Sequence, residues 1–260
     1  MGAIVLHILI MWAAIAIGFG AARLHRKRRK EPKSGEFGAA LGFIASMFGL
    51  LLGLLVVNAT SHYANARTEA QTEATAIVAV FGAVSALKPA IAEPVQHQVV
   101  CYARSVIDGD WRRMDQGSDV EAVSTRNAGD RLRAAIVALP DGSGGSAAAS
   151  KLTEAQAARQ QLLLLAKPTI PTVLWVLIYV GAAVLMFLLA SDLVARRETA
   201  IAGLGCVVVM LTLVVGVLVT LDRPFGPLAR VEPTALRSGL QLIAAGREDA
   251  AYLRPCTDRQ

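Results

Sequence analysis

The sequence predicts an all-α membrane protein with four transmembrane helices and a helical extramembrane domain inserted between spans two and three. Hydrophobic residues make up 54% of the 260-residue chain, and the mean hydropathy is +0.49, which exceeds what one soluble core requires. Four apolar runs are long enough to cross a hydrocarbon core of about 30 Å. None contains Lys, Arg, Asp or Glu, and no segment between them alternates in the manner of a strand.

The predicted spans occupy residues 4–22, 38–57, 172–191 and 200–221. Nothing basic precedes the first run, so we expect an uncleaved span rather than a signal peptide. His7 is its only ionisable side chain. Because His7 lies near the end of the span, we interpret it as a packing or interfacial residue rather than a proton carrier.

A basic loop, residues 23–37, joins the first two spans and predicts the orientation. By the positive-inside rule this loop is cytoplasmic, which puts residues 58–171 and both termini outside the cytoplasm of a bacterial inner (plasma) membrane. The run from Arg26 to Lys30 also suits anionic lipid, although topology explains it first. The net charge of +6 is concentrated beside a span, so we predict no nucleic-acid partner.

The extramembrane domain, residues 58–171, is predicted to be helical throughout. No helix breaker follows the second span before Lys88-Pro89, so one helix from Gly38 to Leu87 would be about 75 Å long. Further helices are expected over 93–114, with Pro94 in the first turn, over 118–139, with Ser118 as the N-cap, and over 150–166. A Gly/Ser linker is expected over 140–149, and residues 222–260 form a tail.

The second span carries small residues at helical spacing beside larger apolar ones. One interpretation is a homo-oligomer in which this helix packs around an axis and lines an apolar pore, or packs against span four. Ordinary packing within one chain explains the pattern equally well. This packing face comprises Gly38, Gly42, Phe43, Ala45, Met47, Gly49, Leu50, Gly53 and Leu54.

Polar groups follow the second span and close the fourth. The polar collar, Asn58, Ser61, Tyr63, Arg67 and Glu73, would form rings in a symmetric oligomer and select ions by charge; a solvated helix surface is the alternative. The turn after span four consists of Asp222, Arg223, Pro224, Phe225 and Gly226. We interpret it as a structural cap, with Pro224 ending the helix and Phe225 as an interfacial anchor.

Two of the three cysteines carry a second compartment signal. Cys101 and Cys256 both fall on the predicted extracytoplasmic side, where a disulfide persists. A bridge and two free thiols are equally compatible with the sequence, because the Cα separation is unknown. The sequence has no catalytic motif, no metal-ligand spacing and no cofactor fingerprint, so we expect no enzyme, cofactor or metal site.

Several motifs together resemble the bestrophin-like family of bacterial membrane proteins over nearly the whole chain. They are Leu54-Leu55-Val56-Val57-Asn58 with Tyr63 and Arg67, Glu73-Ala74-Thr75-Ala76-Ile77, Arg159, Pro171 with Trp175, and Leu221-Asp222-Arg223-Pro224-Phe225. The family is distantly similar to bestrophins, pentameric anion channels whose second helix lines the pore. The resemblance therefore implies a channel with span two at its axis.

Two features depart from bestrophins. Leu228, Ala229 and Arg230 stand where bestrophins carry a calcium-binding acidic cluster, so the resemblance implies no calcium site here. Bestrophins keep their helical domain in the cytoplasm, whereas the charges of this chain predict the opposite side.

The function that we expect is an oligomeric channel or pore. Its anion selectivity is implied by the resemblance alone. The alternative is a non-conducting membrane sensor or scaffold whose helical domain binds a partner in the cell envelope.

Overall fold

The computed structural model describes residues 2–28, 38–116, 118–140, 142–192, 199–226, 228, 230–245, 247 and 250–256. Every regular element in these residues is helical, as predicted, and four helices are long and apolar enough to cross a membrane. The chain divides into two compact units. We call Met1–His62 with Pro168–Asp222 the transmembrane unit, and Tyr63–Lys167 with Arg223–Gln260 the helical unit.

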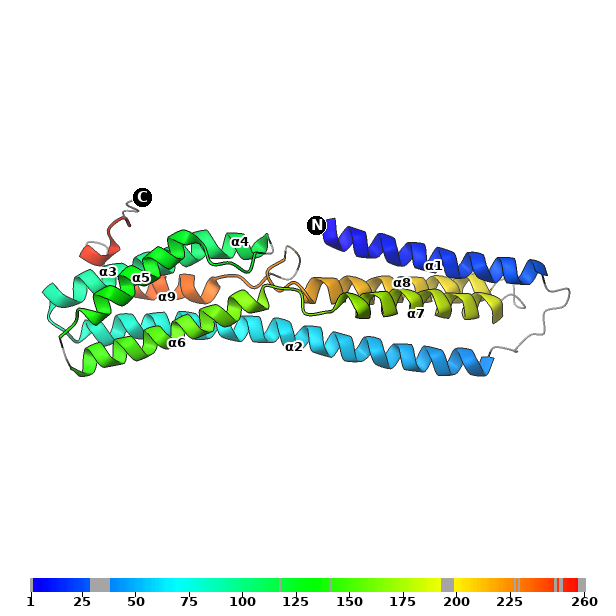
Figure 1. The fold of residues 1–260 in the computed structure, drawn as a ribbon, viewed down its shortest axis with the longest axis horizontal. Coiled ribbons are helices and arrows are strands. Elements are labelled where there is room, and N and C mark those ends of the chain that lie inside the picture. Colours follow the sequence, from blue (N-terminus) through cyan, green and yellow to red (C-terminus); the bar gives the residue numbers. More distant parts are fainter. Residues whose placement is uncertain are drawn as a thin grey trace. The chain divides into compact units, whose positions relative to one another are not determined.

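The transmembrane unit contains α1 (Gly2–Arg28), the first part of α2 (Gly38–Ser85), α7 (Thr172–Asp192) and α8 (Thr199–Leu221). Helices α1, α7 and α8 lie side by side (Figure 1). Glycines allow close packing: a Cβ at Gly18 of α1 would overlap the Ala183 carbonyl of α7, and one at Gly181 of α7 would overlap the Phe48 ring of α2. The remaining apolar surface of each helix is exposed, as expected of helices that face lipid.

The helical unit is built on the rest of α2, which is one uninterrupted helix of 48 residues, as the sequence predicts. Around it lie α3 (Pro89–Ser105), the π-helical segment η1 (Val106–Asp110), α4 (Trp111–Asp115), α5 (Val123–Val137), α6 (Ser143–Leu165), α9 (Thr234–Ala244) and the 3₁₀ turn η3 (Ala251–Leu253). Helix α5 packs beside α3, and α6 runs alongside α2 (Figure 1). Their apolar side chains form one core.

Two of the predicted helix starts are wrong because local signals were assigned to the wrong residue. Helix α3 begins at Pro89, since Lys88 is extended (φ −56°, ψ 139°), and Pro94 lies inside the helix. Helix α5 begins at Val123 rather than after Ser118. The residue at the N-cap position is Ala122, and its own N–H donates to Asp110 Oδ1 over 2.6 Å, so a contact with the preceding π-helical segment holds the start of α5.

The expected Gly/Ser linker is largely the first turns of α6, which begins at Ser143 rather than Ser150. Gly144 packs tightly on α2: a Cβ there would lie 3.3 Å from the Ala83 carbonyl oxygen and 3.2 Å from Leu87 Cδ2. Glycine therefore favours close contact between the two helices, and it is tolerated in α6 despite its poor helix propensity.

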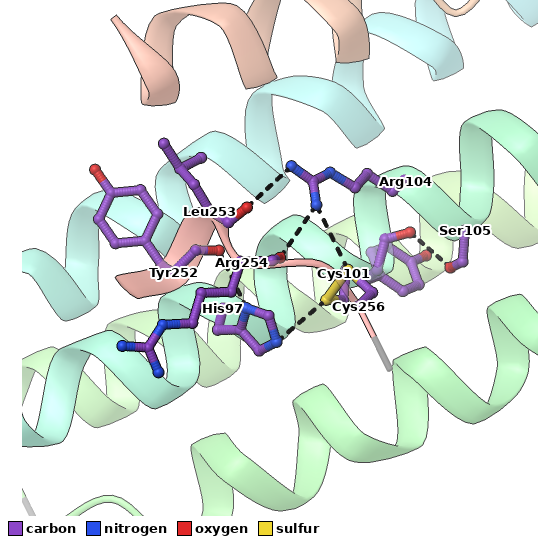
Figure 2. Close-up of a disulfide and its surroundings, with 9 residues drawn as sticks. His97, Cys101, Arg104, Ser105, Tyr252, Leu253, Arg254 and Cys256 are labelled. Atoms are coloured by element: carbon purple, nitrogen blue, oxygen red, sulfur yellow. Dashed lines mark hydrogen bonds between the residues drawn. A yellow bond between two sulfur atoms is a disulfide. The ribbon is translucent and has the colours of Figure 1, made fainter. Parts of the chain in front are cut away.

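A disulfide joins Cys101 of α3 to Cys256 near the C-terminus, with Cα atoms 5.5 Å apart (Figure 2). Of the two alternatives left by the sequence, the structure has the bridge. Polar contacts hold the same segment: the Arg104 guanidinium donates to the carbonyls of Leu253 (3.5 Å) and Arg254 (3.3 Å), and His97 Nδ1 donates to that of Tyr252 (3.1 Å). The C-terminal turn is thus fastened to α3.

Candidate functional site

Four ionisable side chains meet in the core of the helical unit. Glu73 of α2, Tyr102 of α3, Asp110 of η1 and Arg159 of α6 are each 1–2% exposed. Arg159 bonds to Asp110 Oδ2 through Nε (3.1 Å) and through Nη2, and to Glu73 Oε2 through Nη1 (3.4 Å). The Tyr102 hydroxyl donates to Glu73 Oε1 over 3.4 Å. We call these four residues the buried ion cluster.

The π-helical segment η1 sets the geometry of the cluster, because it ends with Asp110 followed directly by Trp111. Asp110 bonds Arg159 with one oxygen and the Ala122 N–H with the other. The Trp111 ring lies 5.3 Å from the Arg159 guanidinium carbon, a cation–π contact. The Trp111 indole in turn donates to the Val231 carbonyl over 2.9 Å. The cluster therefore fixes the start of α5 and the chain after α8.

Two carboxyl groups share one guanidinium in this cluster, so a single positive charge faces two acidic groups. Burial raises the pKa of Glu73; Arg159 lowers it in part, and Asp110 raises it further. Burial, together with the charge of Glu73, also raises the pKa of Tyr102 well above its usual value. The protonated form of Glu73 is thus stabilised relative to an exposed glutamate, and Tyr102 stays a hydrogen-bond donor.

A cavity of about 150 Å³ opens beside the buried ion cluster, between α5 and α6. Tyr102 and Arg159 belong to its lining. A second cavity, of about 210 Å³, lies at the start of α9 and includes Arg112, Arg230 and Arg237 among its lining residues. No group of three or more metal-ligating side chains occurs in the part of the chain that the structure describes.

The residues predicted as a polar collar divide into two sets. Asn58, Ser61 and Arg67 are exposed. Tyr63 packs on the core of the helical unit, and Glu73 belongs to the buried ion cluster. Arg67 and Glu73 thus lie on different faces of α2, and the rings expected in an oligomer stay a prediction.

The small residues of the second span face outward. For Gly38, Gly42, Gly49 and Gly53, no described atom outside the backbone of α2 lies within 4 Å of an added Cβ. Ala45 is half-buried. The packing within the chain instead uses a different face of α2, formed by Phe48, Leu52, Leu55 and Ala59.

The larger side chains predicted beside the stripe also point away from the chain. Phe43, Met47, Leu50 and Leu54 are 56–72% exposed. Packing against span four, and ordinary intrachain packing, therefore do not account for these glycines among the described residues.

The turn after span four is a structural cap, as interpreted from the sequence. Asp222 is 3% exposed, and its Oδ1 accepts the backbone N–H groups of Thr169 (2.7 Å) and Ile170 (2.9 Å), just before α7. Pro224 follows the end of α8, Arg223 is exposed, and its carbonyl accepts the Gly226 N–H over 2.9 Å.

The expected interfacial anchor is wrong. Phe225 is 2% exposed in the core of the helical unit, where it meets the Trp111 ring edge-on at 6.1 Å.

Two remaining predictions concern the first span and its loop. His7 packs on the Trp175 ring at 4.2 Å and bonds Tyr179, in agreement with a packing role. Of the proposed lipid-binding run, Arg26 to Arg28 end α1, whereas Arg29 and Lys30 lie outside the described residues. The lipid site stays a prediction.

Sequence reasoning named Glu73 and Arg159 but missed Tyr102 and Asp110. The Asp110–Arg159 pair is separated by 49 residues, and the Glu73–Arg159 pair by 86. No local pattern reveals such contacts. The available signal was weaker: Asp110 is an acidic residue between a glycine and a tryptophan in an otherwise helical segment.

The bestrophin-like domain family matches residues 7–236. This range contains most of the first span, the other three spans and the buried ion cluster. Neither the curated proteins nor the solved structures contain a significant match. Because the matched range covers well over half of the chain and agrees with its helical, four-span architecture, this protein belongs to the bestrophin-like family of membrane proteins.

Proposed function

We propose that the protein is an oligomeric ion channel in which α2 of each copy surrounds a common axis. The observation that carries this proposal is the uncovered glycine face of α2. Glycine offers little apolar surface to lipid and costs about 1 kcal/mol per residue in a helix relative to alanine. It does allow a second helix to approach closely. Gly42, Gly49 and Gly53 have open space next to them, which suits α2 of a neighbouring copy.

The exposed polar residues above this face support selection of anions. Asn58, Ser61 and Arg67 are exposed along α2, while Glu73 is withdrawn into the buried ion cluster. A ring of Arg67 without Glu73 would attract anions. Arg112 and Arg113 are also exposed, whereas Arg104 is engaged with the C-terminal turn. The apolar stretch from Gly38 to Val57 would then gate by dewetting.

Gly49→Leu tests this proposal, because a Cβ added at Gly49 has open space around it among the described residues. Wild-type protein should migrate as a defined oligomer in detergent and conduct chloride in planar bilayers. Gly49→Leu should break up the oligomer or reduce the current at least tenfold while the monomer stays folded. Gly205→Leu is the matched control, since Gly205 is an exposed glycine of α8 with equally open space.

A monomeric wild-type protein would overturn the proposal, because no axis then exists. Absence of current over a range of voltage, pH and salt would equally overturn it. Equal behaviour of Gly49→Leu and Gly205→Leu would exclude α2 as the axial helix.

We further propose that residues 58–171 and both termini lie outside the cytoplasm of a bacterial inner membrane. Two independent features support this orientation. The basic loop after the first span favours the cytoplasm, and the Cys101–Cys256 bridge is stable in an oxidising compartment. Bestrophins, whose helical domain is cytoplasmic, would suggest the opposite orientation.

The second candidate function is a membrane sensor. The cavity between α5 and α6 favours it, since a polar cavity in the helical unit has no role in a simple scaffold. The two functions are compatible, because a ligand of the helical unit would regulate a channel as readily as it would signal by itself.

A further inference from the structure

We propose that the cavity between α5 and α6 binds a small zwitterion of the free amino acid class. Two helical faces form its walls. Helix α5 contributes Arg126, Gly129, Asp130 and Arg133, and α6 contributes Gln156, Arg159, Gln160 and Leu163. Each set follows the spacing i, i+3, i+4, i+7, which is one face of a helix. Such facing stripes are normally apolar, whereas six of these eight residues are polar or charged.

Gly129 keeps the cavity open. It lies in the middle of α5, where glycine costs about 1 kcal/mol relative to alanine. Packing does not require it: an added Cβ would lie 3.5 Å from Tyr102 Cε2, an ordinary contact. Gly129 itself lines the cavity. The effect of the missing side chain is thus to leave room next to Tyr102 and Arg159.

The charges of the lining favour a ligand that carries both a positive and a negative group. Arg126, Arg133 and Arg159 provide guanidinium groups, and Glu121 and Asp130 provide carboxylates. An anion alone would meet the two carboxylates, and a cation alone would meet the three guanidinium groups. A carboxylate directed at arginine and an ammonium directed at Glu121 or Asp130 satisfy both sets at once.

The ion pairs at the cavity mouth are loose enough to yield to a ligand. Arg126 and Glu121 are 3.5 Å apart, and Arg133 and Asp130 are 3.7 Å apart, compared with about 2.7–2.9 Å in a good charge-assisted hydrogen bond. Gln156 accepts a hydrogen bond from Arg133 over 2.8 Å, which holds this guanidinium at the edge of the cavity.

Arg159 provides the deepest recognition group. Its three hydrogen bonds within the described residues go to Asp110 and Glu73, whereas a guanidinium has five N–H groups. Two N–H groups therefore remain for a ligand carboxylate. The side chain is held rigidly from behind by the cluster and by Trp111, so little entropy is lost on binding.

The cavity is small. Its volume of about 150 Å³ leaves space for several water molecules, so it suits a ligand of a few carbon atoms such as glycine, alanine, serine or threonine.

Isothermal titration of the full-length protein in detergent tests the proposal with glycine, L-alanine, L-serine and L-threonine. We expect saturable binding of at least one of them, with one site per chain. Propionate, which lacks the ammonium group, and ethylamine, which lacks the carboxylate, should bind at least tenfold more weakly. No heat of binding from any of the four amino acids, or equal binding of propionate or ethylamine, would overturn the proposal.

Variants of Gly129 separate binding from folding. Gly129→Ala should raise the melting temperature, because alanine is the better helix former, yet weaken binding several-fold. Gly129→Leu should weaken binding at least tenfold. Gly82→Ala and Gly82→Leu are matched controls, since Gly82 is an exposed glycine of α2 with open space, and they should bind normally. Unchanged affinity in both Gly129 variants would refute the site.

Arg133→Met provides a test that does not depend on Gly129. Its side chain is 57% exposed, so the fold should be insensitive to the change while affinity falls about tenfold. Normal affinity in this variant would contradict a carboxylate held at the cavity mouth. None of these measurements involves a current, so their failure would leave the channel proposal standing.

Discussion

Arg159 compensates two buried carboxyl groups at the same time, Asp110 and Glu73. Removing one partner of a buried ion pair leaves an uncompensated charge in a medium that solvates it poorly. Arg159 also ties α6 to α2 and to η1, so its effect extends beyond one contact. The stability of the helical unit should consequently depend on this residue more than on any exposed arginine.

Arg159→Met should lower the free energy of unfolding of the helical unit by about 3–5 kcal/mol. Methionine roughly keeps the aliphatic part of the side chain but leaves the carboxyl groups of Asp110 and Glu73 without their cationic partner. The measurement is denaturant unfolding followed by tryptophan fluorescence, since Trp111 lies against Arg159. Arg133→Met, at an exposed position, should change the stability by less than about 0.5 kcal/mol. Equal effects of the two substitutions would contradict the cluster.

Glu73 predicts a pH dependence of stability with a definite sign. Burial raises its folded-state pKa above the usual 4.5, so the folded protein holds this proton more tightly than the unfolded chain. The resulting stabilisation is fully present below about pH 4.5 and is lost as the pH rises through the folded-state pKa. Around the carboxyl group, Asp110 adds to the effect of burial on this pKa, whereas Arg159 and Tyr102 oppose it.

Glu73→Gln should therefore be more stable than the wild type at pH 8, by about 1 kcal/mol, with the difference shrinking toward pH 4.5. Melting curves between pH 4.5 and 8 measure this, with Glu154→Gln, at an exposed position, as the control. Any slope that remains is assigned to Glu121, whose pKa burial also raises. A variant less stable than the wild type at pH 8 would show that the ionised pair with Arg159 dominates.

Among the helices, local sequence patterns correctly predicted the elements whose extent depends on the local sequence. The absence of a breaker predicted the full length of α2, and the apolar runs predicted α1, α7 and α8. The start of α6 was missed because Gly144 packs against α2, and that of α5 because Asp110 binds the Ala122 N–H. Contacts between distant segments leave no periodic trace in the sequence, and they determined both starts.

The same reason explains the unequal prediction of the candidate sites. The glycine face of α2 could be recognised from the spacing of its glycines in the sequence. Its exposure could not be predicted, because it depends on which other helices cover α2. The cavity walls of α5 and α6 were not foreseen, because each wall by itself resembles the solvated face of an ordinary helix.

Cys256→Ser should weaken the attachment of η3 to α3. The bridge joins positions 155 residues apart, and loss of such a link costs about 2–5 kcal/mol in the free energy of unfolding. Thermal unfolding of wild-type protein with and without dithiothreitol should reproduce the difference, while the reductant leaves Cys256→Ser unchanged. Cys206→Ser, at the free cysteine of α8, is the control. If the reductant does not affect the wild type, the bridge contributes nothing to stability.

For the whole molecule, the family and the four spans define the architecture, and orientation is the property that the charges predict. Single cysteines in a Cys206→Ala background test it: Ser150→Cys lies at an exposed position of α6, and Lys27→Cys at an exposed position near the end of α1. A membrane-impermeant maleimide added to intact cells should label Ser150→Cys and spare Lys27→Cys. The reverse pattern would place the helical unit in the cytoplasm and overturn the orientation.

The disulfide makes a covalent ring of the chain between Cys101 and Cys256, and α7 and α8 lie within this ring. A protease that cuts once between these two helices would therefore leave both fragments attached until the bridge is reduced. Cys256 is also synthesised after both helices. The ring can therefore close only after all four spans have left the ribosome. Oxidation of this pair would then mark the molecules whose chain has been synthesised through Cys256, and a non-reducing gel compared with a reducing gel would detect them.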